Sequence, residues 1–427
     1  MNRKGNAPIL SFSFVSRFCP LMLKRISTDQ LQVGMFLHEL CGSWMDHPFW
    51  RSKFLLEDPA DVRRITECGI KEAWIDTSRG ADVVGGRTQE EVEAEVELEL
   101  ELAALQPLAP ISPEREFRDA AQLRDRAREQ VRSLFSDARM GKAIETDGCG
   151  PLVEDIVGSI GRNRGALLSL IRLKTQDEYT YLHSVAVCTL MVALGRTLNL
   201  TDQQLHEAGL AGLLHDMGKA RIPLEVLNKP GRLTDAEFGM IKRHPEWGHA
   251  MLQASTGVPS IALDVCWHHH EKVDGSGYPK GLKADQISLF AKMGAVCDVY
   301  DAVTSVRAYK NAWDPGEAVR QMAQWKGHFD QVVFQAFVKT VGIYPMGTLV
   351  KLQSGRLGVV TQPNEASLLT PKVKVFFSAK NKQHITPETV DLASAGCQDK
   401  ITGVESAEVW GFKDLDRYWL DEVGLQR

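Results

Sequence analysis

Five of the twelve histidines lie among other potential metal ligands in the middle of the chain. The segment 214–219 (LHDMGK) places an imidazole beside a carboxylate, and the segment 267–271 (WHHHE) contains three successive histidines. Asp298 lies within the apolar run 295–301 (AVCDVYD), where a carboxylate is costly to bury unless it binds a cation or another partner. The candidate ligands are His183, His215, Asp216, His244, His269, His270 and Asp298.

These ligand types predict a metal centre of a particular kind. Imidazole and carboxylate together favour Mn, Fe or Zn over a soft thiolate site. Five histidines and two aspartates exceed what one catalytic ion needs, because such an ion keeps an open coordination position. Two ions roughly 3.5–4 Å apart, bridged by one carboxylate, would use this number and suit phosphoester chemistry. A single histidine near a helix is usually structural, but the joint occurrence favours a binuclear centre.

The region from about residue 150 to residue 340 closely resembles the HD-GYP family, the HD-superfamily phosphodiesterases that hydrolyse cyclic di-GMP. The resemblance rests on six ordered motifs, which are 179–184 (YTYLHS), 215–219 (HDMGK), 244–245 (HP), 269–279 (HHEKVDGSGYP), 298–302 (DVYDA) and 307–310 (RAYK). Residues 23–85 also resemble the small uncharacterised domain that often precedes HD-GYP domains, at Trp44, at 47–49 and at 75–77.

The resemblance implies a role for each matching position. The first metal would be held by His183, His215 and Asp298, and the second by His244, His269 and His270. Asp216 would bridge the two ions, for which Fe or Mn is expected, and Asp216 and Lys219 would be the catalytic residues. Lys219 would face the scissile phosphate, and Arg307 and Lys310 would meet the phosphates of the cyclic dinucleotide. Gly277 and Tyr278 would form part of the wall around a guanine.

Two positions depart from the family pattern. Some members have a glutamate one helical turn before the first histidine and bind a third ion. Here that position is Tyr179, with Glu178 one residue away, so two metals are expected. The family's Arg-Pro-Tyr-Lys is replaced by 307–310 (RAYK), and the loss of proline should loosen this loop while both cations remain.

The expected mechanism is in-line attack on phosphorus by a hydroxide that bridges the ions, since coordination lowers the pKa of water toward about 7. The ions and Lys219 would stabilise the charge on the non-bridging oxygens. The product would be pGpG, GMP or both. The acid that protonates the leaving oxygen stays open among Asp274, Asp301 and a metal-bound water.

Other conspicuous residues are interpreted as structural or solvated. The histidines in this group are His38, His47, His206, His249 and His268. Glu271 is weighed equally between orienting a ligand histidine and simple exposure. Trp247 and Trp267 are expected in the core rather than as platforms for base stacking.

The leading hypothesis is an active cyclic di-GMP phosphodiesterase that lowers the level of this second messenger. A second hypothesis is an HD phosphohydrolase of another cyclic dinucleotide or nucleotide. A third is a non-catalytic cyclic di-GMP receptor or adaptor, whose Gly-Tyr-Pro loop at 277–279 contacts partners as the family's loops are thought to contact diguanylate cyclases (GGDEF proteins). A homodimer also stays open.

The elements that must position these residues fall into five expected segments. Residues 1–22 are expected to be a disordered extension and 23–85 a small α+β module. An acidic linker and helix follow at 86–145, since 90–101 holds seven glutamates. Helical periodicity favours an all-α domain at 146–342, with a helix start at Thr201 and Asp202. Short β-prone runs predict a small β-rich module at 343–427.

Composition excludes several classes of protein. With 44% apolar residues, the chain is not disordered. A formal net charge of −5 argues against DNA binding through bulk positive charge. The apolar run 179–195 is too short for a membrane span, so a buried helix is expected. Eight scattered cysteines, with no C-x-x-C pair and no signal-peptide cleavage pattern, favour a cytoplasmic protein.

Overall fold

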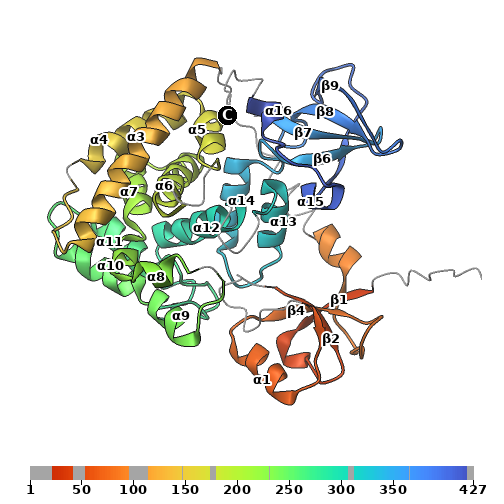
Figure 1. Ribbon diagram of the computed structural model, residues 1–427, viewed down its shortest axis with the longest axis horizontal. Helices are drawn as coiled ribbons and strands as arrows, with labels where there is room; N and C mark the ends of the chain where they lie inside the picture. Colours follow the sequence, from red (N-terminus) through yellow and green to blue (C-terminus); the bar gives the residue numbers. More distant parts are fainter. Residues whose placement is uncertain are drawn as a thin grey trace, which may run out of the picture. The chain divides into compact units, whose positions relative to one another are not determined.

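The computed structural model describes residues 22–41, 53–95, 114–146, 148–173, 179–229, 231–305, 312–364 and 366–420. The chain divides into two compact units, residues 1–92 and residues 93–427. Figure 1 labels the elements of both units. Among the helices of these described ranges, none is both long enough and apolar enough to cross a membrane.

The first unit is built on a five-stranded antiparallel sheet with the strand order β3-β2-β4-β1-β5. Its strands are β1 (Leu23–Ser27), β2 (Phe36–Leu40), β3 (Phe54–Leu55), β4 (Glu72–Asp76) and β5 (Arg87–Thr88). The 3₁₀ helix η1 (Thr28–Gln30) follows β1, and α1 (Pro59–Glu67) precedes β4. Asp58 caps α1 by accepting a hydrogen bond from the Ala60 N–H at 2.8 Å.

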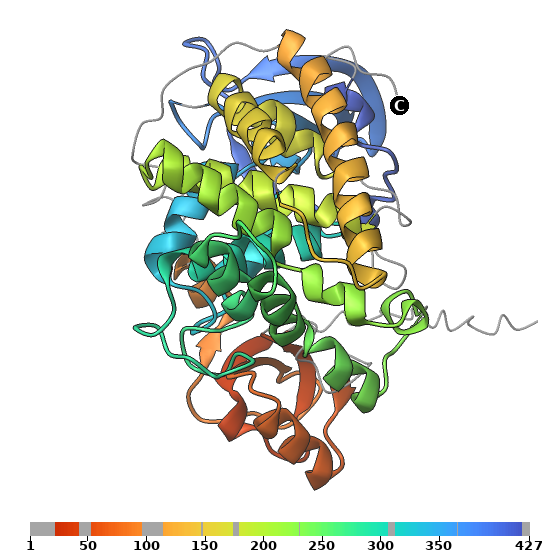
Figure 2. The same cartoon turned by 90° about the vertical axis from the view of Figure 1, so that its left-hand side faces the viewer.

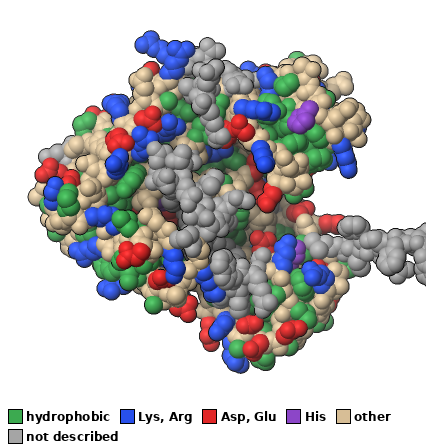
Figure 3. Space-filling view, viewed as in Figure 1, with side chains coloured by type: hydrophobic (Ala, Val, Ile, Leu, Met, Phe, Trp, Pro, Cys, Tyr) green, Lys and Arg blue, Asp and Glu red, His purple; other side chains and the backbone are tan. Residues whose placement is uncertain are grey.

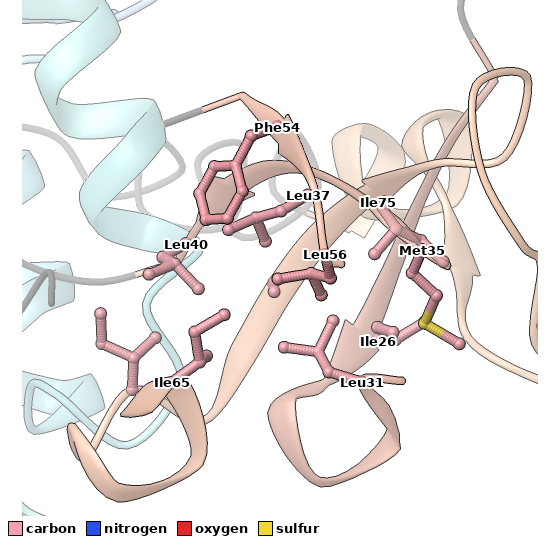
Figure 4. Packing of buried hydrophobic residues seen from close by; sticks show 11 residues of the cluster. Ile26, Leu31, Met35, Leu37, Leu40, Phe54, Leu56, Ile65 and Ile75 are labelled. Atoms are coloured by element: carbon pink, nitrogen blue, oxygen red, sulfur yellow. The ribbon is translucent and has the colours of Figure 1, made fainter. Parts of the chain in front are cut away.

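Apolar residues of this sheet and of α1 form the core of the first unit. Figure 4 shows the side chains of Ile26, Leu37, Leu56, Ile65 and Ile75 gathered between the strands and α1. Each of these residues is at most 2% exposed. The burial of both strand and helix residues against one another is the physical reason that so short a segment holds a defined fold.

The second unit begins with a layer of helices on which the candidate ligands lie. These helices are α3 (Glu114–Arg139), α4 (Cys149–Arg162), α5 (Arg164–Leu170), α6 (Tyr179–Thr197), α7 (Asp202–Leu214), η4 (Met217–Arg221), α8 (Leu224–Leu227), α9 (Asp235–Ile241), α10 (His244–Gln253), α11 (Ser260–His268), α12 (Leu289–Thr304), α13 (Pro315–Ala323) and α14 (Gln331–Val341). Figure 2 shows α3 running along this layer.

The α6–α7 pair forms the centre of the helical layer. Thr201 caps α7 through a capping box with Gln204, so the predicted helix start is confirmed. Helix α7 approaches α6 closely at Gly212, where an added Cβ would lie 2.8 Å from the Cys188 backbone N. Backbones this close exclude any side chain larger than hydrogen, which sets the distance between the candidate ligands His183 and His215.

A second antiparallel sheet follows the helices, with the order β10-β6-β7-β8-β9. Its strands are β6 (Leu349–Leu352), β7 (Arg356–Gln362), β8 (Lys372–Ser378), β9 (Gln383–Asp391) and β10 (Ile401–Val404). Two short helices, α15 (Ala407–Trp410) and α16 (Arg417–Leu420), end the described chain. The prediction of a helical core with strand-containing regions on both sides is therefore confirmed.

The surface carries both signs of charge. In Figure 3, Lys and Arg side chains alternate with Asp and Glu side chains over the visible face. This pattern agrees with the near balance of 50 basic and 55 acidic residues in the sequence.

We expect Asp314→Ala to destabilise the second unit by about 1–2 kcal/mol, because one carboxylate serves two elements. Its Oδ1 accepts the Gly316 N–H at 2.8 Å at the start of α13, and its Oδ2 accepts the Leu349 N–H of β6 at 3.0 Å. Urea unfolding followed by circular dichroism measures the change. Asp202→Ala, at an exposed position in the first turn of α7, is the control and should change stability by less than about 0.5 kcal/mol. Equal effects of both substitutions would contradict this assignment.

Candidate metal centre

The structure brings all seven candidate ligands into one buried cluster. His183 lies near the start of α6, Asp298 lies in α12, and His244 is the first residue of α10. The others flank helix ends: His215 and Asp216 follow α7, and His269 and His270 follow α11. Six of the seven side chains belong to residues that are at most 4% exposed, and the His270 side chain is 7% exposed.

The ligand atoms gather in two groups that share Asp216. One group contains His183, His215 and Asp298, with the His183 Nε2 2.9 Å from the Asp298 Oδ1. The other contains His244, His269 and His270, where the His244 Nε2 lies 3.2 Å from the Nε2 atoms of both other imidazoles.

Asp216 extends one oxygen toward each group. Its Oδ2 lies 3.4 Å from the His183 Nε2 and 3.3 Å from the His215 Nε2. Its Oδ1 lies 3.2 Å from the His244 Nε2 and 3.9 Å from the His269 Nε2. A carboxylate with its oxygens divided in this way is placed to join two cations.

Backbone carbonyls set which nitrogen of three imidazoles faces the cluster. The Nδ1 of His215 donates to the Gly212 carbonyl at 2.8 Å, and the Nδ1 of His244 donates to the Ile241 carbonyl at 2.7 Å. The Nδ1 of His269 donates to the Val265 carbonyl at 3.0 Å. Because Nδ1 carries the proton in each ring, the Nε2 lone pair points into the cluster.

These contacts fit one metal ion within each of the two groups. Imidazole nitrogens that surround one ion at about 2.1 Å lie about 3.0–3.4 Å from one another, as they do here. Two lone pairs at 3.2 Å repel each other unless a cation lies between them. The buried Asp216 Oδ1 and His215 Nε2 also lack a hydrogen-bond partner within the described residues. Buried polar atoms normally have a partner, so this is what we expect of atoms that bind a metal ion.

The electrostatics of the cluster favour cations. Burial would lower the pKa of His183, but hydrogen bonds with Asp216, Asp298 and Asp301 outweigh it and raise this pKa to about 9. Burial lowers the pKa of His269 to about 3, and the neighbouring His215 and His244 add to this effect. His269 is therefore neutral at pH 7, which is the form that binds metals.

Lys219 lies beside the cluster in η4. Its Nζ contacts the Asp216 Oδ2, and its side chain is 19% exposed. Burial would raise the pKa of Asp216, but Lys219 and His215 outweigh burial and hold this pKa well below its usual range. The amine therefore stands where it can meet both the carboxylate and an anion that enters from solvent.

Gly277 and Tyr278 lie directly against the second histidine group. An added Cβ on Gly277 would lie 2.4 Å from the Lys272 N and 2.6 Å from the His270 carbonyl oxygen, so only glycine allows this approach. The Tyr278 N–H donates to the His270 carbonyl at 3.2 Å, and the two rings stack with centroids 4.7 Å apart. Tyr278 therefore fixes the orientation of the His270 ring.

Glu271 holds the loop that carries these two residues. It is 2% exposed, and its carboxylate accepts the Lys280 N–H at 2.7 Å and the Leu282 N–H at 2.9 Å. Of the two alternatives weighed for Glu271, this burial contradicts simple exposure, and the two contacts are with backbone amides rather than with a ligand histidine. The contacts tie the two ends of the loop together, which requires a carboxylate with an oxygen for each amide.

The two carboxylates considered as acids make other contacts. The Asp301 Oδ2 accepts from the His183 Nδ1 at 2.6 Å, on the side of the ring opposite the cluster. The Asp274 Oδ1 accepts the Ser276 N–H at 2.8 Å and the Ser276 hydroxyl at 2.7 Å. Asp301 is thus a carboxylate that orients His183, a role that the sequence interpretation missed although the i, i+3 spacing from Asp298 was visible.

The other histidines and the tryptophans singled out in the sequence do not belong to the ligand cluster. The His268 Nδ1 pairs with the Asp264 Oδ1 at 2.8 Å, and the His206 Nε2 donates to the Gly150 carbonyl at 3.2 Å, in agreement with structural roles. The expectation that Trp247 and Trp267 are core residues was wrong, because both are half-buried. Trp267 lies between the His249 ring, 3.9 Å away, and the Lys280 amine.

Several expectations lie outside the described residues. These are Arg307 and Lys310, the loop 307–310, His47 and Trp44 in the first unit, Glu178, and the side chain of Tyr179. The proposed absence of a third metal ligand before His183 therefore stays a prediction.

Comparison with known proteins identifies the family. The HD domain family model matches residues 167–333, and the model of a domain of unknown function (DUF3391) matches residues 23–149. The cyclic di-GMP phosphodiesterase PA4108 of Pseudomonas aeruginosa is 55% identical over 399 residues, which are 93% of this chain and 96% of that protein. The chain belongs to the HD-GYP family.

Other relatives match shorter regions of the chain. The cyclic di-GMP phosphodiesterase response regulator RpfG of Xanthomonas campestris is 40% identical over 33% of this chain and 38% of its own length. The 3′3′-cGAMP-specific phosphodiesterase 1 of Vibrio cholerae is 34% identical over 41% of each chain. Among solved structures, Bd1817 of Bdellovibrio bacteriovorus matches with a TM-score of 0.46 and 17% identity, covering 74% of this chain and 98% of that chain.

We expect Asp301→Asn to weaken metal binding about 10- to 100-fold, because a neutral amide no longer stabilises the His183 orientation by charge. Titration of the metal-free protein with Mn²⁺, followed by calorimetry, measures the change. The matched control is Asp264→Asn, since Asp264 forms the same type of pair with His268 outside the cluster. Unchanged Mn²⁺ affinity in Asp301→Asn would contradict the role of this carboxylate.

A second substitution tests the packing beneath Asp216. An added Cβ at Gly218 would lie 1.9 Å from the His244 carbonyl oxygen, so Gly218→Ala must push η4 away from α10. We expect this shift to separate Asp216 from His244 and to lower the bound metal toward one ion per chain, as measured by elemental analysis. Gly239→Ala in α9, where an added Cβ meets no atom within 4 Å, should keep the full metal content. If both variants bind equal metal, the packing argument fails.

Proposed function

We propose that this chain hydrolyses cyclic di-GMP to pGpG, GMP or both at a centre of two divalent metal ions. The observation that carries the proposal is the Asp216 carboxylate, whose two oxygens face two separate ligand groups. The relative that is 55% identical over 93% of this chain is a cyclic di-GMP phosphodiesterase, which supports the substrate.

Each of the two ions would be held by its own group of ligands. His183, His215 and Asp298 would hold one, His244, His269 and His270 the other, and Asp216 would bridge them. Bound ions of this kind activate water as a nucleophile near neutral pH and polarise phosphoryl oxygens. Imidazole with carboxylate favours Mn, Fe or Zn, and the resemblance to the HD-GYP family favours Fe or Mn among these.

The chain's own side chains have further roles around the phosphate. Lys219 supplies a positive charge for a non-bridging phosphate oxygen, because its amine lies at the Asp216 Oδ2 and is part-exposed. Tyr278 keeps His270 oriented and forms a wall beside it, and Gly277 allows that wall to approach. We propose that Arg307 and Lys310 meet the remaining phosphate charge.

A second candidate substrate is 3′3′-cGAMP. A relative that is 34% identical over 41% of this chain is a phosphodiesterase specific for that dinucleotide. The cluster specifies a phosphodiester more strongly than a base, since the described site residues are of types that bind metals and phosphate. Turnover of the two dinucleotides in one mixture distinguishes the candidates, and we expect a higher kcat/KM for cyclic di-GMP.

A receptor without catalytic activity is less well supported. All seven candidate ligands are present and lie together, whereas a protein that only binds the dinucleotide has no need of a complete set. Contacts of the loop at 277–279 with diguanylate cyclases, a cytoplasmic location and a homodimer are also part of the proposal and are tested separately.

We expect Asp216→Asn to lower kcat for cyclic di-GMP by at least about 10³-fold, because an amide has one neutral oxygen and cannot bridge two cations as a carboxylate does. Chromatography of the products after incubation with Mn²⁺ or Fe²⁺ measures the loss and separates pGpG from GMP. Asp285→Asn, an exposed carboxylate of the same unit, is the control and should retain full activity. No hydrolysis by the metal-loaded wild-type protein would overturn the proposed function.

A further inference from the structure

The C-terminal end of α3 makes a direct contact with the loop that carries the catalytic candidates. The Nη1 of Arg139, the last residue of α3, donates to the Ile222 carbonyl at 3.0 Å. Its Nη2 donates to the Lys219 carbonyl at 3.4 Å. One planar guanidinium therefore holds two carbonyls at the end of η4, which a fork of fixed donors does better than a single amine.

The contact matters because η4 is held by two sets of contacts, one with α10 and one with Arg139. Asp216 is the residue before η4, and Lys219 lies within it. On one side η4 packs on α10 so closely that Gly218 approaches the His244 carbonyl and the Gly248 N. Arg139 holds the other side. Without the guanidinium, the Lys219 and Ile222 carbonyls would lose a charged donor, while the α10 contact would remain.

Helix α3 is firmly fixed to the helical layer along its length. At its start, the Glu116 carboxylate accepts two hydrogen bonds from Arg162 of α4, at 2.7 and 2.9 Å. Near its end, the Phe135 ring contacts the Tyr181 ring of α6 edge-on with centroids 5.8 Å apart. The view in Figure 2 shows the lower end of α3 beside η4.

The family assignments divide the chain differently from the structure. The match to the domain of unknown function extends to residue 149 and includes α3, whereas the HD domain match begins at residue 167. In the structure, residues from 93 onward form one compact unit, so α3 belongs with the helices that carry the metal ligands. The segment matched by the N-terminal family thus contributes a side-chain contact to the segment that carries Asp216 and Lys219.

We propose that Arg139, at the end of α3, is a positioning residue for Asp216 and Lys219. Only the predicted change in kcat rests on the proposed function, whereas the predicted change in amide exchange does not. Any displacement of the C-terminal end of α3 moves the guanidinium and thereby the carbonyls of Lys219 and Ile222.

The experiment compares Arg139→Met with wild-type full-length protein. Methionine retains an apolar stem of similar length and removes the donors. Hydrogen–deuterium exchange is measured at the Lys219 and Ile222 amides, which donate to the Asp216 and Lys219 carbonyls within η4. We expect exchange to accelerate at least about tenfold at these two amides and to stay unchanged in α6 and α12.

The kinetic arm uses the same proteins loaded with Mn²⁺. We expect kcat for cyclic di-GMP to fall about 10- to 100-fold with KM within twofold, because misplacement affects the reacting groups more than binding. Arg139→Lys keeps a cation but has a single donor nitrogen in place of the guanidinium fork, so both its exchange and its kcat should lie between those of Arg139→Met and the wild type. The control is Arg132→Met, two turns earlier on α3, whose side chain is 65% exposed.

Several results would overturn the proposal. One is unchanged exchange at the two η4 amides in Arg139→Met. Another is faster exchange throughout the second unit, since Arg139 would then act in folding rather than on the loop. A third is a set of variants in which exchange and kcat do not change together. The exchange measurement needs no substrate, so it decides the role of Arg139 even if cyclic di-GMP is not hydrolysed.

Discussion

The candidate site depends on imidazole nitrogens and carboxylates that lie close together around Asp216. Imidazole lone pairs that approach within 3.2 Å repel one another, and the two aspartates buried beside them place two negative charges in a medium of low dielectric. Only positive charge between them makes the arrangement favourable. The helices must therefore hold the ligands at these distances before an ion arrives, and the fold contains several devices that do so.

The first device is the use of backbone carbonyls one turn earlier to orient imidazoles. His215, His244 and His269 all donate their Nδ1 proton to such a carbonyl. His183 lies in the first turns of α6 and uses a carboxylate, Asp301, in place of a carbonyl. The second device is glycine at close backbone approaches, at Gly212 between α6 and α7 and at Gly218 between η4 and α10. Together they limit both the rotation and the separation of the ligands.

Much of the site could be predicted because metal ligands and phosphate-binding side chains can be recognised by residue type. The seven ligand candidates, Lys219 and the loop at 277–279 stand out as motifs, and the structure brings them together. Residues that act through another side chain were harder to predict. Asp301 resembles any acid in an apolar helix, and Glu271 resembles any exposed acid beside a histidine pair, until their partners are known. Trp247 and Trp267 were assigned to the core on hydrophobicity alone, which ignores that large aromatic rings often lie half-buried.

The sequence by itself determined the donor set, the helical periodicity that carries it, and the strand-forming runs at both ends of the chain. The tertiary structure alone decided which nitrogen of each imidazole faces inward, how the Asp216 oxygens divide between the two groups, and that α3 packs with the helices that carry the candidate ligands. The reason is physical. Residue type and spacing act over one or two helical turns, whereas these features depend on contacts between segments up to 118 positions apart, such as His183 with Asp301.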